Sequence, residues 1–265
     1  MKFRLIAVLS VFVMLISGVH SYSYSAKAIC LYDTKTKQMV YGYNEAIRML
    51  PASITKIVTA ITALELGNPD DIVTVDQKSA NTEGSSLYLR AGEQLSLINL
   101  IYGMMLHSGN DAANAIATHF GYEEFVEQMN ETVKRAGATD SHFENPSGLD
   151  GENHLVTALD MARITAYAME NPVFSEIVGT KNKNIVSEDG YTRYLKNHNK
   201  LLWMYENTKG VKTGFTKKAG RTLVSSATDG ERNLICVTLN DADDWNDHIS
   251  LYKSYLKPPP KEGAQ

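Results

Sequence analysis

Strand-like segments stand at both ends of this 265-residue chain, and helical segments fill its middle. A polar turn, Asp33–Lys37, separates the first two strands, and Asp229-Gly230 marks a later turn. This order predicts one α/β layer built from both chain ends and an all-α region, roughly residues 68–170, that meets it at a cleft. The strands are expected over residues 26–32, 38–43, 210–214, 222–227 and 233–240.

Helical periodicity dominates the middle of the chain. Pro51 and Gly67 bracket a helix expected over residues 53–66, with proline near the start and glycine past the end. Pro172 follows the end of another expected helix. A turn-rich loop, Asn145–Asp150, interrupts this region. The remaining helices are expected over residues 95–106, 111–120, 122–136, 157–169 and 245–256.

The N-terminus has the pattern of a secretory signal peptide. Lys2 and Arg4 precede an apolar run, Leu5–Val19, and small residues follow it. We therefore expect residues 1–25 to direct export to the extracellular or cell-wall space. The alternative is a retained anchor, and membrane contact is expected only in that case; the run is shorter than the about 20 residues that a span needs. Residues 258–265 are expected to be a disordered tail.

Composition narrows the function classes. A hydrophobic content of 43% suits a full-sized core, and a net charge of −4 gives no support for nucleic-acid binding. The pattern closest to a zinc site consists of His142, Asp150 and His154. These residues flank a loop, so no metal or cofactor is expected. Cys30 and Cys236 lie in apolar strands and are expected to be buried thiols, although export would permit a disulfide.

Three short motifs carry the chemistry. They are Ser53-Ile-Thr-Lys56, Ser108-Gly-Asn110 and Lys212-Thr-Gly214, in that order. Each of the first two has decoys, since Ser-x-x-Lys recurs at Ser250 and Ser254 and Ser-x-Asn at Ser79. The ordered trio is therefore more specific than any single match.

Ser53 and Lys56 suit nucleophilic catalysis. Three positions apart on a helix, they share one face, and Ser53 falls near the helix start, where free N–H groups favour negative charge. Lys56 can accept the serine proton only when neutral, so its pKa must fall some 3 units below the usual value of about 10.4. Burial and a second cation both act in that direction. The structural alternative is a helix cap followed by a solvated lysine.

The other two motifs suit the substrate. Gly109 permits a tight turn that aims Ser108, as a proton relay, and Asn110, as an amide ligand, into one space. Alternatively, either residue caps the next helix. Lys212 and Thr213 lie on a candidate edge strand where they can face a carboxylate. Gly214 lets a ligand approach the backbone closely. The alternative there is a solvent-facing edge with a protective lysine.

With these residues the chain resembles the serine D-alanyl-D-alanine carboxypeptidases of peptidase family S11, the low-molecular-weight penicillin-binding proteins. The resemblance covers roughly residues 26–257, taken as one catalytic domain. It implies an α+β fold of the β-lactamase/transpeptidase type, with a mainly antiparallel sheet flanked by helices and an all-α subdomain. The segments that carry it beyond the trio are 51–60, 145–149, 212–216 and 219–220.

The resemblance also implies roles. Ser53 would be the acylated nucleophile, Lys56 its base and Ser108 the relay to the leaving D-alanine, while Asn110 would hold the substrate amide. Lys212 and Thr213 would bind the terminal carboxylate, and the N–H groups of Ser53 and Phe215 would form the oxyanion hole. The implied substrate is a peptidoglycan stem peptide ending in D-Ala-D-Ala, with β-lactams as covalent inhibitors. Family members often carry a cysteine where Thr222 stands.

Two other functions stay open. A β-lactamase shares the fold, but no Glu-x-x-Leu-Asn string supplies a deacylating base here. A non-catalytic penicillin-binding cell-wall module would not need all the chemical residues. Within the enzyme class, transpeptidation and cross-link cleavage are also possible.

Overall fold

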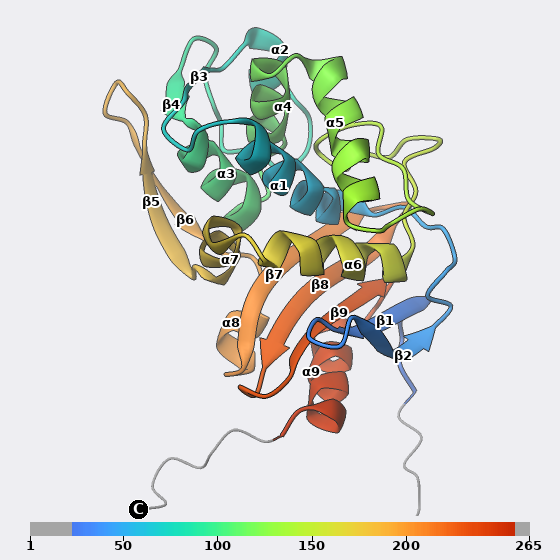
Figure 1. Cartoon of the computed structure of the whole chain (residues 1–265). Helices are drawn as coiled ribbons and strands as arrows, with labels where there is room; N and C mark the ends of the chain where they lie inside the picture. The colour runs from blue at the N-terminus through green and yellow to red at the C-terminus, as the bar shows by residue number, and fades with distance from the viewer. Residues whose placement is uncertain (1–22, 258–265) are drawn as a thin grey trace, which may run out of the picture.

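A five-stranded antiparallel sheet joins the two ends of the chain in the computed structural model, which describes residues 23–257 (Figure 1). The strand order is β2-β1-β9-β8-β7, so β7 is an edge strand. The expected tail, 258–265, and most of the expected signal peptide lie outside the described residues. The strands are β1 (Ala28–Asp33), β2 (Gln38–Tyr43), β7 (Thr208–Thr216), β8 (Gly220–Thr228) and β9 (Asn233–Leu239).

Helices cover both faces of this sheet. Successive side chains of a strand point to opposite faces. In β1, Cys30 packs with the large core beneath α6 (Ala158–Met169), whereas Ile29 and Leu31 pack with the smaller core beneath α9 (Asp244–Tyr255). Every residue of β1 is therefore buried, which explains its continuous apolar sequence.

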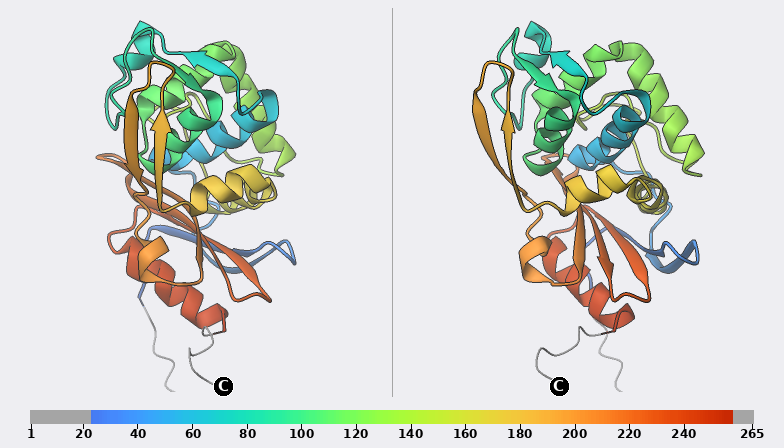
Figure 2. Two further views of the ribbon diagram at one scale, coloured as in Figure 1. Left: turned by 90° about the vertical axis from the view of Figure 1, so that its left-hand side faces the viewer. Right: turned by 60° about the vertical axis from the view of Figure 1, so that its left-hand side comes forward.

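The helices within residues 56–135 form a second layer above α6 (Figures 1 and 2). Ser53 lies in a short 3₁₀ turn, η1 (Ala52–Thr55), that leads directly into α1 (Lys56–Leu66), and Gly67 ends this helix as expected. The antiparallel sheet flanked by helices confirms the predicted fold class. The other helices are α2 (Gln77–Ala80), α3 (Leu97–Leu106), α4 (Asn110–His119), α5 (Tyr122–Arg135), α7 (Pro172–Gly179) and α8 (Leu201–Met204).

The prediction misplaced the start of one helix and missed α7 altogether. The helix expected from residue 95 begins at Leu97, because β4 (Gln94–Ser96) pairs with β3 (Ile72–Thr74). Pro172 follows the end of α6, as expected, and it also opens α7, where Asn171 caps the N–H groups of Val173 and Phe174. A proline at the first helical position loses no hydrogen bond, so it fits either role.

A hairpin of β5 (Asn182–Val186) and β6 (Thr192–Lys196) was not predicted. It rises beside the helical layer, at the left in Figure 1. Only Ile185, Arg193 and Leu195 are buried in its two strands, so the apolar signal is weak. Arg193 anchors the hairpin through a two-pronged ion pair with buried Glu93.

Cys30 and Cys236 are free, buried thiols, as expected. Burial raises the pKa of Cys30 to about 12, so this thiol is unreactive at neutral pH. Among residues 23–257, no helix has the length and apolar character that crossing a membrane requires.

Candidate active site

Lys56 lies at the centre of the site, fully buried behind Ser53. Its Nζ donates to Ser53 Oγ at 3.0 Å and to Asn110 Oδ1 at 2.7 Å, and a third bond reaches the carbonyl of Ser147. Three segments far apart in the sequence therefore meet at one nitrogen. The solvated lysine considered as an alternative does not occur.

Burial lowers the pKa of Lys56 well below its ordinary value. The positive charge of Lys212 lowers it further, and Asp111 partly opposes both effects. These are the two causes that the proposed base requires. The three bonds donated by Nζ belong to the charged form; the lowered pKa makes loss of one proton easier, and the neutral amine can then take a proton from Ser53.

Ser108 lies in the break between α3 and α4, with a left-handed backbone (φ +66°). Its Oγ accepts a hydrogen bond from Lys212 Nζ at 3.1 Å, and the same nitrogen donates to the Thr213 carbonyl at 2.8 Å. Burial lowers the pKa of Lys212 to about 7. Lys212 therefore lies behind the cavity wall, while Thr213 lines the cavity itself.

Asn110 opens α4 and links Lys56 to the wall of the site. Its Nδ2 donates to the Glu83 carbonyl at 2.7 Å, and its N–H donates to the Ser85 carbonyl at 2.7 Å. The next residue, Asp111, accepts bonds from the N–H groups of Leu87 and Leu89. Helix α4 thereby holds the 83–89 loop, which brings Ser85 into the cavity.

Gly214 lets the edge strand approach the nucleophile closely. A Cβ at this position would lie 2.8 Å from the backbone nitrogen of Ser53, tighter than real contacts allow. Thr222, opposite Gly214 on β8, donates through Oγ1 to the Pro51 carbonyl at 2.9 Å. The role of this threonine was not apparent from sequence: it ties the sheet to the segment that carries Ser53.

The Asn145–Leu149 loop supports Ser53 from the other side. Asn145 Oδ1 accepts bonds from the N–H groups of Ser147 and Gly148, which turns the Ser147 carbonyl toward Lys56. Gly148 has φ +86°, and a Cβ there would overlap the carbonyl oxygen of Ala52. The predicted turn is thus part of the site's framework.

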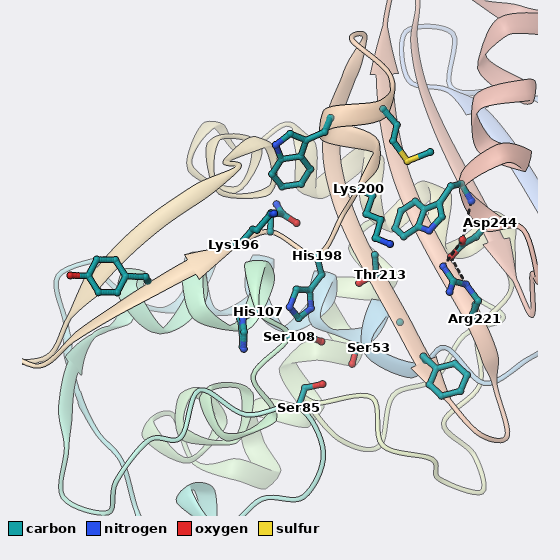
Figure 3. A pocket seen from close by; sticks show the side chains of 17 residues that line it. Ser53, Ser85, His107, Ser108, Lys196, His198, Lys200, Thr213, Arg221 and Asp244 are labelled. Atoms are coloured by element: carbon teal, nitrogen blue, oxygen red, sulfur yellow. Dashed lines mark hydrogen bonds and ion pairs between the residues drawn. The ribbon is translucent and has the colours of Figure 1, made fainter.

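A cavity of about 1060 Å³ opens at Ser53, Ser108 and Thr213 (Figure 3). Phe215 is 65% exposed at its rim. His107 packs against His198, with ring centroids 4.8 Å apart. Sequence reasoning missed much of the lining because these residues belong to no motif and reach the cavity only through tertiary folding. The missed residues include Ser85, Tyr194, Lys196, His198, Lys200, Trp203, Arg221, Asp244 and Trp245.

The decoy serines and the candidate zinc ligand His154 do not line this cavity. Ser79, in the decoy Ser-x-Asn, bonds to Asp76 at the start of α2. Ser250 and Ser254, in the decoy Ser-x-x-Lys strings, lie on α9. His154 is buried against Thr55, with Nε2 2.8 Å from Oγ1.

Comparison with known proteins decides the family. The model of the D-alanyl-D-alanine carboxypeptidase family, peptidase family S11, matches residues 17–243. The chain belongs to this family. The predicted family is thereby confirmed.

Individual S11 relatives agree. DacF, a D-alanyl-D-alanine carboxypeptidase of Bacillus subtilis (strain 168), is 32% identical over 222 residues, which cover 81% of this chain and 57% of DacF. DacD of Escherichia coli (strain K12) is 36% identical over 225 residues, covering 79% of this chain and 56% of DacD. The chain thus spans little more than half the length of these curated relatives.

Solved structures of similar enzymes share the fold. The Streptomyces K15 DD-transpeptidase has a TM-score of 0.82 at 27% identity, over 87% of this chain and 96% of that chain. A D-alanyl-D-alanine carboxypeptidase from Mycobacterium tuberculosis H37Rv has a TM-score of 0.83 at 30% identity, over 87% and 90%.

Proposed function

We propose that this protein is a serine-type D-Ala-D-Ala carboxypeptidase that removes the terminal D-alanine from peptidoglycan stem peptides through an acyl-enzyme. One observation carries the proposal: the buried Lys56 amine lies 3.0 Å from Ser53 Oγ, and its pKa is lowered. A nucleophile within hydrogen-bond reach of a neutral base is what acyl transfer requires. S11 family membership supports the same reaction.

Acylation follows from this geometry. Ser53 Oγ attacks the carbonyl carbon of the penultimate D-alanine while Lys56 takes the hydroxyl proton. The backbone N–H groups of Ser53 and Phe215 stabilise the oxyanion; the close approach of Gly214 to the Ser53 nitrogen supports this pairing. Ser108, bonded to Lys212, passes a proton to the departing amine.

Substrate binding uses the cavity wall beside the nucleophile. Thr213 lines the cavity and receives the terminal carboxylate, and Lys212, directly behind it, adds positive potential. Asn110, bonded to Lys56 through Oδ1 and to the Glu83 carbonyl through Nδ2, holds the amide of the acyl chain by exchanging the Glu83 bond. Water then hydrolyses the Ser53 ester, and β-lactams acylate the same serine. No cofactor or metal enters this mechanism.

The proposal extends to location and organisation. Residues 26–257 form the catalytic unit, with the helical part roughly over 68–170, and the enzyme acts outside the cell membrane, where peptidoglycan lies. Membrane contact requires that residues 1–25 be retained. These points rest on the sequence pattern and on the substrate class.

Mass spectrometry of the purified protein tests the activity. After incubation with penicillin, a penicilloyl adduct is expected on the peptide that contains Ser53, and a stem pentapeptide should lose one D-alanine. Ser53→Ala should abolish both, whereas the decoy variant Ser250→Ala should retain both. D-alanine release that survives Ser53→Ala would refute the mechanism. Rapid turnover of a chromogenic cephalosporin would favour a β-lactamase instead.

A further inference from the structure

Two carboxylates are buried without a cation beside the first residues that the structure describes. Asp241 and Asp247 are each 1% exposed, and within residues 23–257 neither forms an ion pair. The Ser25 N–H donates to Asp247 Oδ2 at 2.7 Å, and the Ser25 hydroxyl lies 2.5 Å from Asp241 Oδ1. A buried charge without a partner is costly, so these two residues, here called the carboxylate pair, require a proton or a cation.

Hydrogen bonds within the fold leave the carboxylate pair incomplete. Asp241 Oδ2 is buried and has no hydrogen-bond partner among the described residues. Burial and the charge of Asp241 raise the pKa of Asp247 to about 6, and the two carboxyl groups are close enough to share one proton. Above that pH the shared proton is lost, and two like charges then lie next to each other out of water.

None of the described neighbours supplies the missing positive charge. Burial lowers the pKa of His248, on α9, to about 3, so this imidazole is neutral. Arg221 accepts the Asp241 N–H through its carbonyl, but its guanidinium pairs with Asp244 at 2.7 Å. Cys236 is a neutral thiol, because burial raises its pKa. A cation from outside this set of residues is therefore required to balance the pair.

The sequence can supply a cation at this place. Ser23 and Ser21 occupy the first and third positions before the Ser23–Tyr24 bond, the spacing of small residues that a leader-cleaving peptidase requires. Cleavage there leaves an α-ammonium on Tyr24, three covalent bonds and at most about 3.7 Å from the Ser25 nitrogen. Because that nitrogen already bonds to Asp247, the ammonium lies near the distance of about 4–6 Å within which it stabilises a carboxylate.

The contacts of residues 24 and 25 argue against the next possible cleavage site. Ser25 and Ser23 have the same spacing before Ala26, but cleavage there would remove Ser25. The Ser25 hydroxyl also accepts the Asp243 N–H at 2.9 Å, so its loss would open the turn that precedes α9. Tyr24 packs edge-on against Tyr41, with ring centroids 5.6 Å apart. Both residues are part of the fold.

We propose that the chain is cleaved between Ser23 and Tyr24 and that the new α-ammonium of Tyr24 binds the carboxylate pair. The inference rests on export, which belongs to the proposed function, and it places the cleavage two residues before the end of the expected 1–25 segment. A separate peptidase breaks the amide bond by addition of water, which leaves a carboxylate on Ser23 and an amine on Tyr24. The amine takes up a proton and fixes the mature N-terminus to α9 and to the end of β9.

N-terminal sequencing tests the cleavage. The full chain is expressed with its own N-terminal segment in a bacterium that exports proteins, and the protein is purified from outside the cytoplasm. The mature chain should begin at Tyr24. A chain that begins at Ala26, or one that keeps residues before Tyr24, would overturn the proposal.

The pH dependence of N-terminal labelling tests the binding. An amine-reactive reagent is applied across pH, and the labelled N-terminal peptide is quantified by mass spectrometry, so that the midpoint reports the pKa of the α-amine. In the mature protein this pKa should lie about one unit above the ordinary value of about 7.7–8.0. Asp247→Asn keeps the shape of the carboxyl group and should remove at least half of this shift, and Asp241→Asn/Asp247→Asn should remove nearly all of it. Asp243→Asn is the matched control, because Asp243 is an exposed carboxylate of the same turn that bonds to Asn246.

The labelling result decides the role of the carboxylate pair. An α-amine with the ordinary pKa would refute the binding even if the chain begins at Tyr24. A shift that Asp243→Asn reduces as much as Asp247→Asn does would show a general effect of acidic residues instead of binding to the buried pair. D-alanine release from a stem pentapeptide is measured on the same protein: its absence would refute the proposed function and leave the result at the N-terminus standing.

Discussion

Lys56 and Lys212 are two buried lysines that serve one site, and the charge of the second lowers the pKa of the first. Each donates to a different serine, Lys56 to Ser53 and Lys212 to Ser108. Two like charges held out of water destabilise each other, so at least one neutral amine is favoured. The base and the proton relay are therefore electrostatically linked.

The first prediction concerns the pH dependence of acylation. The rate of penicilloylation should rise with pH through the folded pKa of Lys56, because only the neutral amine accepts the Ser53 proton. Lys212→Met removes the neighbouring cation and should move this profile to higher pH. Stopped-flow acylation across pH measures it, with Lys209→Met, an exposed lysine of the same strand, as the control. An unmoved profile in Lys212→Met would contradict the coupling.

The second prediction concerns stability. The pKa of Lys212 is about 7 in the folded protein, compared with the ordinary lysine value of 10.5 that applies to the unfolded chain. Between these pH values the unfolded chain therefore binds one more proton than the folded protein. The free energy of unfolding should therefore increase by about a few kcal/mol as pH rises from 7 to 10.5, because Lys212 loses its proton in the folded protein first. Below pH 7 Lys212 is charged in both states, and the full cost of burying that charge lowers the stability. Urea titrations should show this rise in wild type relative to Lys212→Met. Parallel curves for the two proteins would rule it out.

The third prediction isolates the close packing at Gly148. Gly148→Ala combines a positive φ with overlap on Ala52, while Gly137→Ala has φ +75° and open space around the new Cβ. Gly137→Ala should cost about 1–2 kcal/mol of unfolding free energy, the left-handed backbone term alone. Gly148→Ala should cost roughly 1–3 kcal/mol more and slow acylation at least about tenfold, because the overlap displaces the segment before Ser53. If the two variants lost the same free energy of unfolding, the Ala52 carbonyl would have moved away from the new Cβ without cost.

The fourth prediction concerns Thr222. Thr222→Val leaves the buried Pro51 carbonyl without its donor and should lower the free energy of unfolding by about 1–3 kcal/mol. Thr222→Ser keeps a hydroxyl and should recover most of the loss. Denaturation midpoints together with acylation rates report whether the bond also positions Ser53. A valine variant as stable as wild type would show that the bond contributes little.

The fifth prediction concerns the anchor of the hairpin. Arg193→Met removes the buried partner of Glu93, which keeps only the Arg90 N–H bond and the exposed Arg90 guanidinium at 3.5 Å, and should destabilise the protein by about 3–5 kcal/mol. The double variant Glu93→Gln/Arg193→Met should restore much of this stability but release the hairpin, seen as faster amide exchange over residues 182–196. If the single and double variants are equally unstable, the cost lies in the lost Arg193 bonds to the Leu87 and Tyr88 carbonyls.

Local signals explain what the sequence predicted well. The first hairpin, α1 and α5 have polar turns, Pro and Gly boundaries, or helical periodicity, and each of these acts within a few residues. Ser53, Lys56 and Asn110 were found because the reaction demands those groups in order. The structure places all three in one hydrogen-bonded cluster.

Long-range contacts explain what the sequence did not show. β5 and β6 have few buried residues, and their anchor depends on Glu93, about a hundred residues away. Thr222 acquires its role only because β8 passes beneath Pro51. Lys196 and Lys200 look like ordinary surface lysines in sequence, and only the tertiary positions of the hairpin end and of the start of α8 bring them to the cavity.

The pairing of β1 with β9 has a consequence for synthesis. A ribosome delivers Ser53 and Lys56 early but β7, which carries Phe215 and its proposed oxyanion N–H, late, so the nucleophile lacks this partner until most of the chain has been made. Folding dominated by such distant pairs is slow compared with helix formation. The helical middle can gain structure first, and a nascent or truncated chain without β7–β9 has no assembled site with which to capture a β-lactam.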